Sequence, residues 1–90
     1  MSKVAAKSQF TECELVVLQF LQEGRSKKGT FEISEIGAGI GLNDNDEILR
    51  ALYTLEGRSL VTPDPEGNFT SKNWKITDDG VKALNFLAEG

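Results

Sequence analysis

The stretch ISEIGAGIGLNDNDEILRALYTLEGRSLV, residues 33–61, predicts two helices joined by a turn and followed by an extended segment. In its first part three isoleucines recur at helical spacing: Ile33, Ile36 and Ile40. Residues 43–46 are a cluster of helix-capping side chains, and the second helix is expected to run from there to Glu56. The buried face of this second helix is predicted to consist of Ile48, Leu52 and Leu55.

The first of these two helices contains Gly37, Gly39 and Gly41. A glycine inside a helix costs roughly 0.5–1 kcal/mol relative to alanine, so packing rather than intrinsic propensity must hold this helix. We therefore expect neighbouring elements to approach the glycines closely. The Gly-x-Gly-x-Gly spacing does not predict a nucleotide-binding loop, because no core-length strand precedes it.

An earlier helix is expected between residues 11 and 24. Thr11 and Glu14 have the three-residue spacing of a capping box, in which each side chain bonds the backbone N–H of the other residue. An apolar helical period then continues to the end of the range. A polar loop over residues 25–29 and a short extended segment over 30–33 connect this helix to the central stretch.

A β-hairpin is predicted after the central stretch. The expected strands are residues 60–62 and 69–76, on either side of a segment at 63–68 that is rich in turn-forming residues. One face of the second strand carries Trp74 and Ile76, which are expected to face the core because side chains alternate along a strand. For Trp74, packing against Phe69 or against the third helix of the chain, which is the second helix of the central stretch, is the expected outcome. The alternative is that Trp74 anchors an interaction with a partner.

A last helix is expected after Thr77, whose side chain is suited to cap it. The apolar side of this helix is formed by Val81, Leu84, Phe86 and Leu87. The order of elements predicts an α+β, mostly helical fold of the winged helix-turn-helix class, with a three-helix core, a two-stranded wing with a short third strand, and a C-terminal helix. The wing is the pair of strands with the turn between them. Residues 10–90 are expected to form this single domain, after a flexible N-terminal tail at residues 1–9.

Two segments of the chain resemble transcription regulators of the MarR-like and PadR-like families. The pattern of their helix-turn-helix and first wing strand is matched by Ser34-Glu35-Ile36, Gly41-Leu42, Leu55-Glu56 and Leu60-Val61. The pattern of their closing strand and helix is matched by Ile76, Thr77, Gly80 and Leu84. The resemblance covers about residues 10–88, and it implies a DNA-binding module whose third helix enters the major groove.

The resemblance places the expected DNA contacts on the third helix and the wing. The candidates on the third helix are Asn45, Arg50 and Thr54, and those on the wing are Lys72, Asn73 and Lys75. In this interpretation the two lysines bind phosphates and Arg50 contacts a base edge. The alternative interpretation is that the lysines are ordinary surface residues.

Three carboxylates at the start of the third helix disfavour contact with a polyanion: Asp44, Asp46 and Glu47. Acids at a helix N-terminus stabilise the helix by ~0.3–1 kcal/mol each, which is one sufficient reason for them. A second interpretation is that, together with Phe69, they form a surface for a basic protein partner. The chain would then be an acidic protein–protein interaction module that does not bind DNA. In a third interpretation, one of these carboxylates contacts DNA by accepting a hydrogen bond from a cytosine amino group.

The composition disfavours catalysis. The 90 residues include no histidine and one cysteine, Cys13, so there is no His-dependent triad, no internal disulfide and no Cys/His zinc site. The paired acids at residues 78–79 fall where a helix start favours acids. We therefore expect no enzyme activity, no cofactor and no metal. The formal charge of −4 also lowers general affinity for phosphates.

The distribution of apolar residues predicts the cellular location of the protein and its assembly with partners. No apolar run approaches the ~18–20 residues that a membrane span needs, and we expect a cytoplasmic protein without membrane contact. The first and last helices carry more apolar residues than one small core requires. They are therefore predicted to form a homodimer interface or another docking surface.

Overall fold

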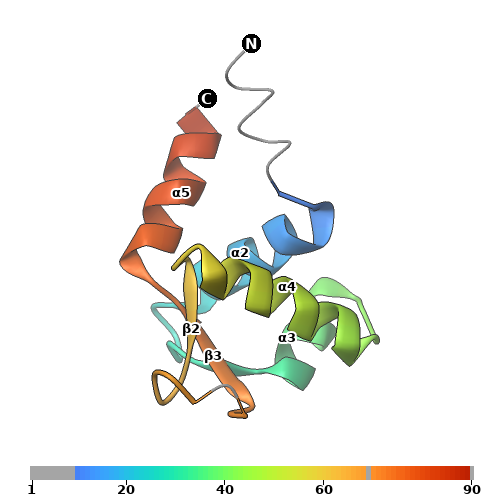
Figure 1. The fold of residues 1–90 in the computed structure, drawn as a ribbon. Helices are drawn as coiled ribbons and strands as arrows, with labels where there is room; N and C mark the ends of the chain where they lie inside the picture. The colour runs from blue at the N-terminus through green and yellow to red at the C-terminus, as the bar shows by residue number, and fades with distance from the viewer. Residues whose placement is uncertain (1–9, 69, 90) are drawn as a thin grey trace.

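The computed structural model describes residues 10–68 and 70–89 of the chain. Its elements, in chain order, are α2 (Glu12–Gly24), β1 (Phe31–Glu32), α3 (Ile33–Ile40), α4 (Asn45–Gly57), β2 (Val61–Pro63), β3 (Asn73–Ile76) and α5 (Asp78–Glu89). Figure 1 shows α2, α3 and α4 grouped on one side of a small sheet, with α5 running away from the end of β3. The α+β winged-helix fold predicted from the sequence is thereby confirmed. The predicted tail at residues 1–9 lies outside the described residues.

The sheet has the order β1-β3-β2, and both pairings are antiparallel. Trp74 of β3 lies opposite Phe31 of β1 on one side and Pro63 of β2 on the other. The short third strand expected near residue 31 therefore joins the edge of β3.

Strand β3 is shorter than the sequence indicated, because it begins at Asn73 and not near residue 69. In the turn before Asn73, side chains form hydrogen bonds with backbone groups. The Asn68 carboxamide oxygen accepts hydrogen bonds from the N–H (3.1 Å) and the hydroxyl (2.6 Å) of Thr70. The Ser71 hydroxyl donates to the Asp64 carbonyl at 2.6 Å. These bonds form a compact wing tip in place of further strand pairing.

The core lies between the sheet and the three packed helices α2, α3 and α4. Its fully buried side chains include Val17, Leu18, Ile36, Ile48, Leu52, Leu55 and Trp74. Trp74 lies edge-to-face with Tyr53 of α4, and the ring centroids are 5.9 Å apart. The expected packing of Trp74 against the third helix is confirmed, and this contact fixes the wing relative to α4.

The two glycines inside α3, Gly37 and Gly39, allow close packing, as expected. A Cβ atom on Gly39 would overlap the Phe20 ring, and one on Gly37 would lie 2.6 Å from the Leu42 carbonyl oxygen. Gly41 differs, because nothing lies within 4 Å of the place that a Cβ atom would occupy there. It ends α3 with φ of 75°, a left-handed conformation that glycine adopts without steric cost. The packing explanation is therefore wrong for Gly41.

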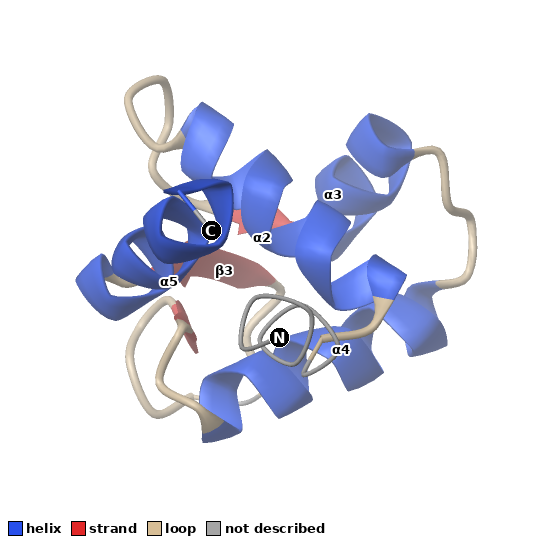
Figure 2. Cartoon of the chain, turned by 90° about the horizontal axis from the view of Figure 1, so that it is seen from above, coloured by secondary structure: helices blue, strands red, loops and turns tan. Residues whose placement is uncertain are grey.

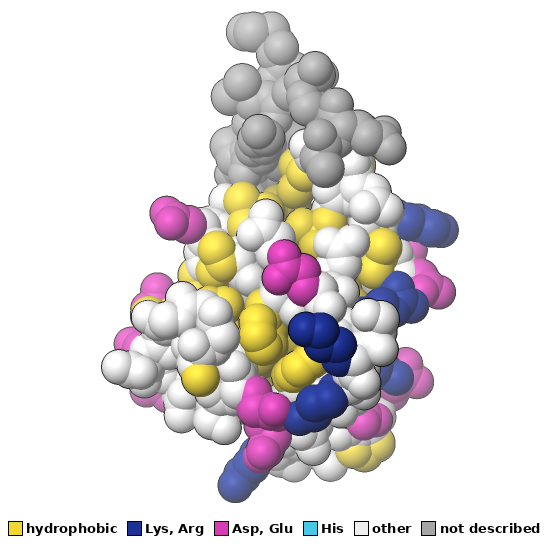
Figure 3. Space-filling view, turned by 180° about the vertical axis from the view of Figure 1, so that it is seen from behind, with side chains coloured by type: hydrophobic (Ala, Val, Ile, Leu, Met, Phe, Trp, Pro, Cys, Tyr) yellow, Lys and Arg dark blue, Asp and Glu magenta, His cyan; other side chains and the backbone are white. Residues whose placement is uncertain are grey.

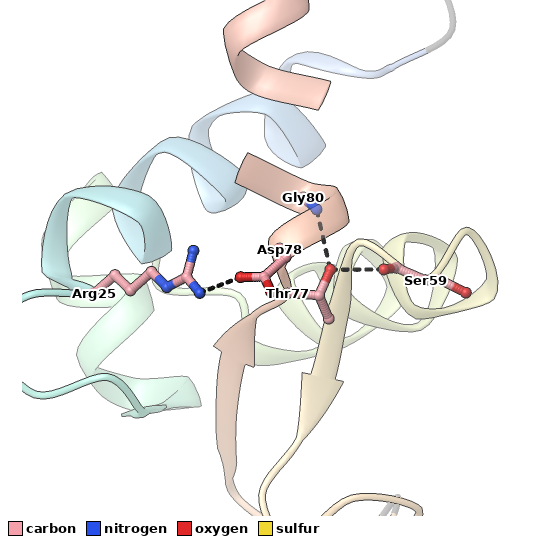
Figure 4. Close-up of polar contacts among 5 residues, drawn as sticks. All are labelled: Arg25, Ser59, Thr77, Asp78 and Gly80. Carbon is pink, nitrogen blue, oxygen red and sulfur yellow. Dashed lines mark hydrogen bonds and ion pairs between the residues drawn. The ribbon is translucent and has the colours of Figure 1, made fainter. Parts of the chain in front are cut away.

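Helix α5 is attached to the rest of the fold at its first turn. The Thr77 hydroxyl accepts a hydrogen bond from the Gly80 N–H at 3.0 Å and donates one to the Ser59 carbonyl at 2.7 Å, as Figure 4 shows. Asp78 forms an ion pair with Arg25, which follows α2. Further along α5, Leu84 is buried, whereas Phe86 is 64% exposed. Phe86 therefore does not belong to the apolar side that packs on the core.

Candidate nucleic-acid interface

Helix α4 carries three of the six candidate DNA contacts, Asn45, Arg50 and Thr54, and its start is set by Asp44. The Asp44 carboxylate accepts hydrogen bonds from the N–H groups of Asp46 (3.1 Å) and Glu47 (3.2 Å). One of the three acids thus serves as an N-cap. From there the helical period buries Ile48 and Leu52 and leaves the polar residues of the opposite face in solvent.

The flank of α4 that faces the wing borders a hollow of about 270 Å³. This wing-side hollow is lined by Glu32, Ile33, Ser34, Asn45, Leu49 and Lys72. The Ile33 N–H donates to the Lys72 carbonyl at 3.1 Å, which holds Lys72 beside the start of α3. The structure therefore brings together two sequence-predicted residues, Asn45 and Lys72. Asn73 is exposed next to them, opposite Glu32 in the β1–β3 pairing.

The opposite flank of α4 faces the start of α2 across a hollow of about 410 Å³. This α2-side hollow is lined by Thr11, Glu12, Cys13, Glu14, Glu47, Arg50, Ala51 and Thr54. Arg50 thus borders the same hollow as Glu12, Glu14 and Glu47, and the Thr54 hydroxyl donates to the Arg50 carbonyl at 3.0 Å. Burial, followed by the charges of Glu47 and Glu14, raises the pKa of the Cys13 thiol. The two α4 candidates Arg50 and Thr54 therefore lie apart from Lys72.

Lys75 borders neither the wing-side hollow nor the α2-side hollow. It borders a hollow of about 600 Å³ on the outer face of the sheet, together with Arg25, Thr62, Glu66 and Asp78. Side chains alternate along β3, so Lys75 faces outward while Trp74 and Ile76 face the core. This position is on the opposite face of the sheet from the helix core, and the wing-side hollow does not include it.

Two cations of the loop after α2 are paired with acids. Lys28 Nζ lies 2.6 Å from Glu35 Oε2, and Arg25 contacts Asp78. The Glu32 backbone N–H, followed by Lys28, holds the pKa of Glu35 below its ordinary value. Arg25 likewise lowers the pKa of Asp78, first through its hydrogen bond and then through its charge. Figure 3 shows lysine and arginine side chains next to acidic ones, with no continuous basic stripe on that face.

The other two acids at the start of α4, Asp46 and Glu47, are exposed. Within residues 10–68 and 70–89, the carboxylates of Asp46 and Glu47 accept no hydrogen bond. Phe69, the aromatic residue proposed for a protein-binding surface, lies outside the described residues. In the part of the chain that is described, no group of three His, Cys, Asp or Glu side chains is arranged to hold a metal ion. No described helix combines the length and apolar character needed to cross a membrane.

The fold is similar to that of a solved structure, the YusO protein from Bacillus subtilis, with a TM-score of 0.69 and 22% sequence identity. The match covers 92% of this chain and 56% of the YusO chain, so the present chain spans little more than half of that protein. At this identity the similarity concerns the fold. Neither a scan against protein-family models nor a search of curated proteins gives a match.

Proposed function

We propose that the chain is a non-catalytic module that binds duplex DNA through α4 and the wing and acts in transcription regulation. One observation carries the proposal: Asn45 of α4, Ser34 at the start of α3, and Lys72 of the wing line a single hollow. Amides are side chains that can read bases and ammonium groups can bind phosphates, so residues of both kinds on one side of the helix-turn-helix support the proposal. The resemblance to winged-helix regulators supports the same function.

The dimensions of α4 fit this use. Its 13 residues span about 20 Å at 1.5 Å per residue, and its N-terminal turn is exposed. A helix of this kind enters a major groove about 12 Å wide with its first residues toward the base edges. Lys72 then contacts the flanking phosphate. Arg50 has a smaller role in affinity because the neighbouring carboxylates reduce the positive potential around it.

A second candidate function is the binding of a basic protein. It is favoured by the charges around the starts of α3 and α4, where Glu32, Asp44, Asp46 and Glu47 are all exposed. The pairing of Arg25 and Lys28 with acids further reduces the positive surface, in a chain of net charge −4. In this case the damaging substitutions are Asp46→Lys and Glu47→Lys, because they reverse the charge that attracts the partner.

A homodimer is proposed as the assembled form in either case. Phe86 is 64% exposed on α5, and hydrophobic side chains are visible at the surface in Figure 3. Covering such residues with a second copy through α2 and α5, which lie next to each other in Figure 2, removes apolar surface from water. Sedimentation equilibrium measures this directly, and a mass that stays monomeric at all concentrations contradicts the dimer.

DNA binding is tested by amide NMR spectra of the labelled protein during addition of a mixed-sequence duplex at low salt. The expected result is a set of shifts concentrated at residues 45–54 and 70–76, which fade as salt is added. Lys72→Glu is expected to abolish the shifts. Lys82→Glu makes the same charge change at an exposed position on α5 and is expected to retain them.

The absence of shifts even at low salt contradicts DNA binding and leaves the basic protein partner as the function to pursue. Equal weakening by Lys72→Glu and Lys82→Glu contradicts the proposed interface at α4 and the wing, because it indicates that net charge alone controls the interaction.

A further inference from the structure

The hollow of about 600 Å³ that Lys75 borders on the outer face of the sheet is separate from the wing-side hollow at the proposed DNA interface. Its volume is typical of pockets that bind small molecules. Three segments far apart in the sequence line this outer-sheet hollow: the loop after α2, the wing, and the start of α5. A small molecule bound there contacts all three segments at once.

The sheet side of the hollow carries Lys75 with a threonine on each neighbouring segment. Thr62 of β2 lies opposite Lys75 in the β2–β3 pairing. Thr30 directly precedes Phe31, which lies opposite Trp74, so the same antiparallel register places Thr30 opposite Lys75. Side chains directly opposite each other in a sheet share one face, and all three line the hollow. One ammonium group and two hydroxyl groups therefore face the same space.

The charged groups of the outer-sheet hollow differ in whether they have partners. Arg25 extends to Asp78 at the start of α5 and forms an ion pair with it, as Figure 4 shows. The side chains of Lys75 and Glu66 form no ion pair and no hydrogen bond within residues 10–68 and 70–89. The Thr30 hydroxyl also has no hydrogen-bond partner in that part of the chain. One positive group and one negative group are thus left to pair with a ligand.

We propose that the outer-sheet hollow binds a small zwitterion of the α-amino acid class. The carboxylate of such a ligand accepts hydrogen bonds from the Lys75 ammonium group and the Thr30 hydroxyl, and its ammonium group donates to the Glu66 carboxylate. Lys75 is half-buried, and an ammonium group partly removed from water interacts more strongly with an anionic partner.

Ligands of a single charge fit the same groups less well. A phosphate or a duplex backbone is repelled by Glu66 and Asp78, and a simple cation is repelled by Lys75 and Arg25. A zwitterion avoids both penalties because it presents each charge to the opposite one. The site is thus an addition to the proposed DNA interface and does not depend on it.

The first experiment records amide NMR spectra of the labelled full chain while the common free L-amino acids are added one at a time, without DNA. The expected result is saturable shifts at residues 29–30, 62, 66 and 75–78. The amino acid that binds best is then compared with two analogues, one without the α-amino group and one without the α-carboxylate. Each analogue is expected to bind roughly tenfold more weakly or worse, because it leaves Glu66 or Lys75 unpaired.

The second experiment repeats the titration with variants of the two unpaired groups. Lys75→Gln is expected to weaken the amino acid by about tenfold or more, whereas Lys82→Gln, the same change at an exposed position of α5, is expected to retain it. Glu66→Gln is expected to weaken the amino acid but not the analogue without the α-amino group. Unchanged spectra away from the hollow verify that each variant is folded.

Three results overturn the proposal. Absence of saturable shifts with every amino acid removes the site. Equal binding of the amino acid and the analogue without the α-amino group removes the role of Glu66 and the zwitterion. Equal weakening by Lys75→Gln and Lys82→Gln removes the assignment to the hollow. Since no duplex is present in these titrations, none of these results decides whether the chain binds DNA.

Discussion

The two faces of helix α4 differ in how far packing with the rest of the protein constrains their side chains. On the inner face Ile48, Leu52 and Leu55 are fully buried against the rest of the core. On the outer face Asn45, Asp46 and Arg50 are exposed. Packing thus specifies the inner residues, while the outer residues can vary with little effect on folding. Stability and recognition are expected to be separable on this one helix.

The largest effect is expected from the inner face. Leu52→Ala removes a fully buried side chain and is expected to lower the free energy of unfolding by about 2–5 kcal/mol, because it loses apolar burial and leaves a cavity. Arg50→Ala on the outer face is expected to change it by less than about 0.5 kcal/mol. Chemical denaturation followed by circular dichroism measures both. Equal losses in the two variants contradict the separation of the faces.

An intermediate effect is expected at the N-terminus of α4. Asp44→Ala removes the N-cap of α4 and is expected to cost about 1 kcal/mol, because two backbone N–H groups lose their acceptor. Asp46→Ala, two residues later, leaves the cap in place and is the matched control. The same denaturation experiment distinguishes them. A larger loss in Asp46→Ala contradicts the assignment of the cap to Asp44.

The smallest effect is expected from the surface ion pair of Arg25 and Asp78. Arg25 lowers the pKa of Asp78 from its ordinary value of 3.8, so the pair stabilises the fold above that value. This contribution is lost as the pH falls through the lowered pKa and the carboxyl group becomes protonated. Asp78→Asn is therefore expected to be less stable than the wild type at pH 7.

As the pH falls through the lowered pKa of Asp78, the two proteins are expected to converge in stability, because the wild-type carboxyl group then loses its charge. Thermal unfolding from pH 7 to the acid limit measures the difference. Asp79→Asn serves as the control, since Asp79 lies in the same turn but is not the residue that Arg25 contacts. A constant difference between wild type and Asp78→Asn at every pH contradicts the role of the pair.

Local features of the fold were predictable from the sequence. The Thr11–Glu14 capping box is present as predicted, with both reciprocal hydrogen bonds at 3.1 Å. The buried face of α4 and the inward direction of Trp74 also agree with the apolar periods. These features depend on residues a few positions apart, so short-range patterns contain the necessary information.

Long-range contacts were not predictable in the same way. Arg25 and Asp78 are 53 residues apart, and no periodicity relates them. The hollow that Lys75 borders depends on how the loop after α2 crosses the sheet. One signal was available but unused: Asn45 and Thr54 are nine positions apart, which is roughly half a turn at ~100° per residue. That angle separates them onto the two flanks of α4, as the structure does.

The contact between Tyr53 and Trp74 has an optical consequence. These are the single tyrosine and the single tryptophan of the chain, and their rings are 5.9 Å apart. Light absorbed by the tyrosine is therefore expected to be transferred efficiently to the indole while the wing is docked on α4, and less efficiently when the two rings move apart. Because Trp74 is fully buried and its indole N–H has no hydrogen-bond partner within the described residues, its emission is expected at short wavelength. The native chain thus contains its own fluorescent reporter of the junction between α4 and the wing.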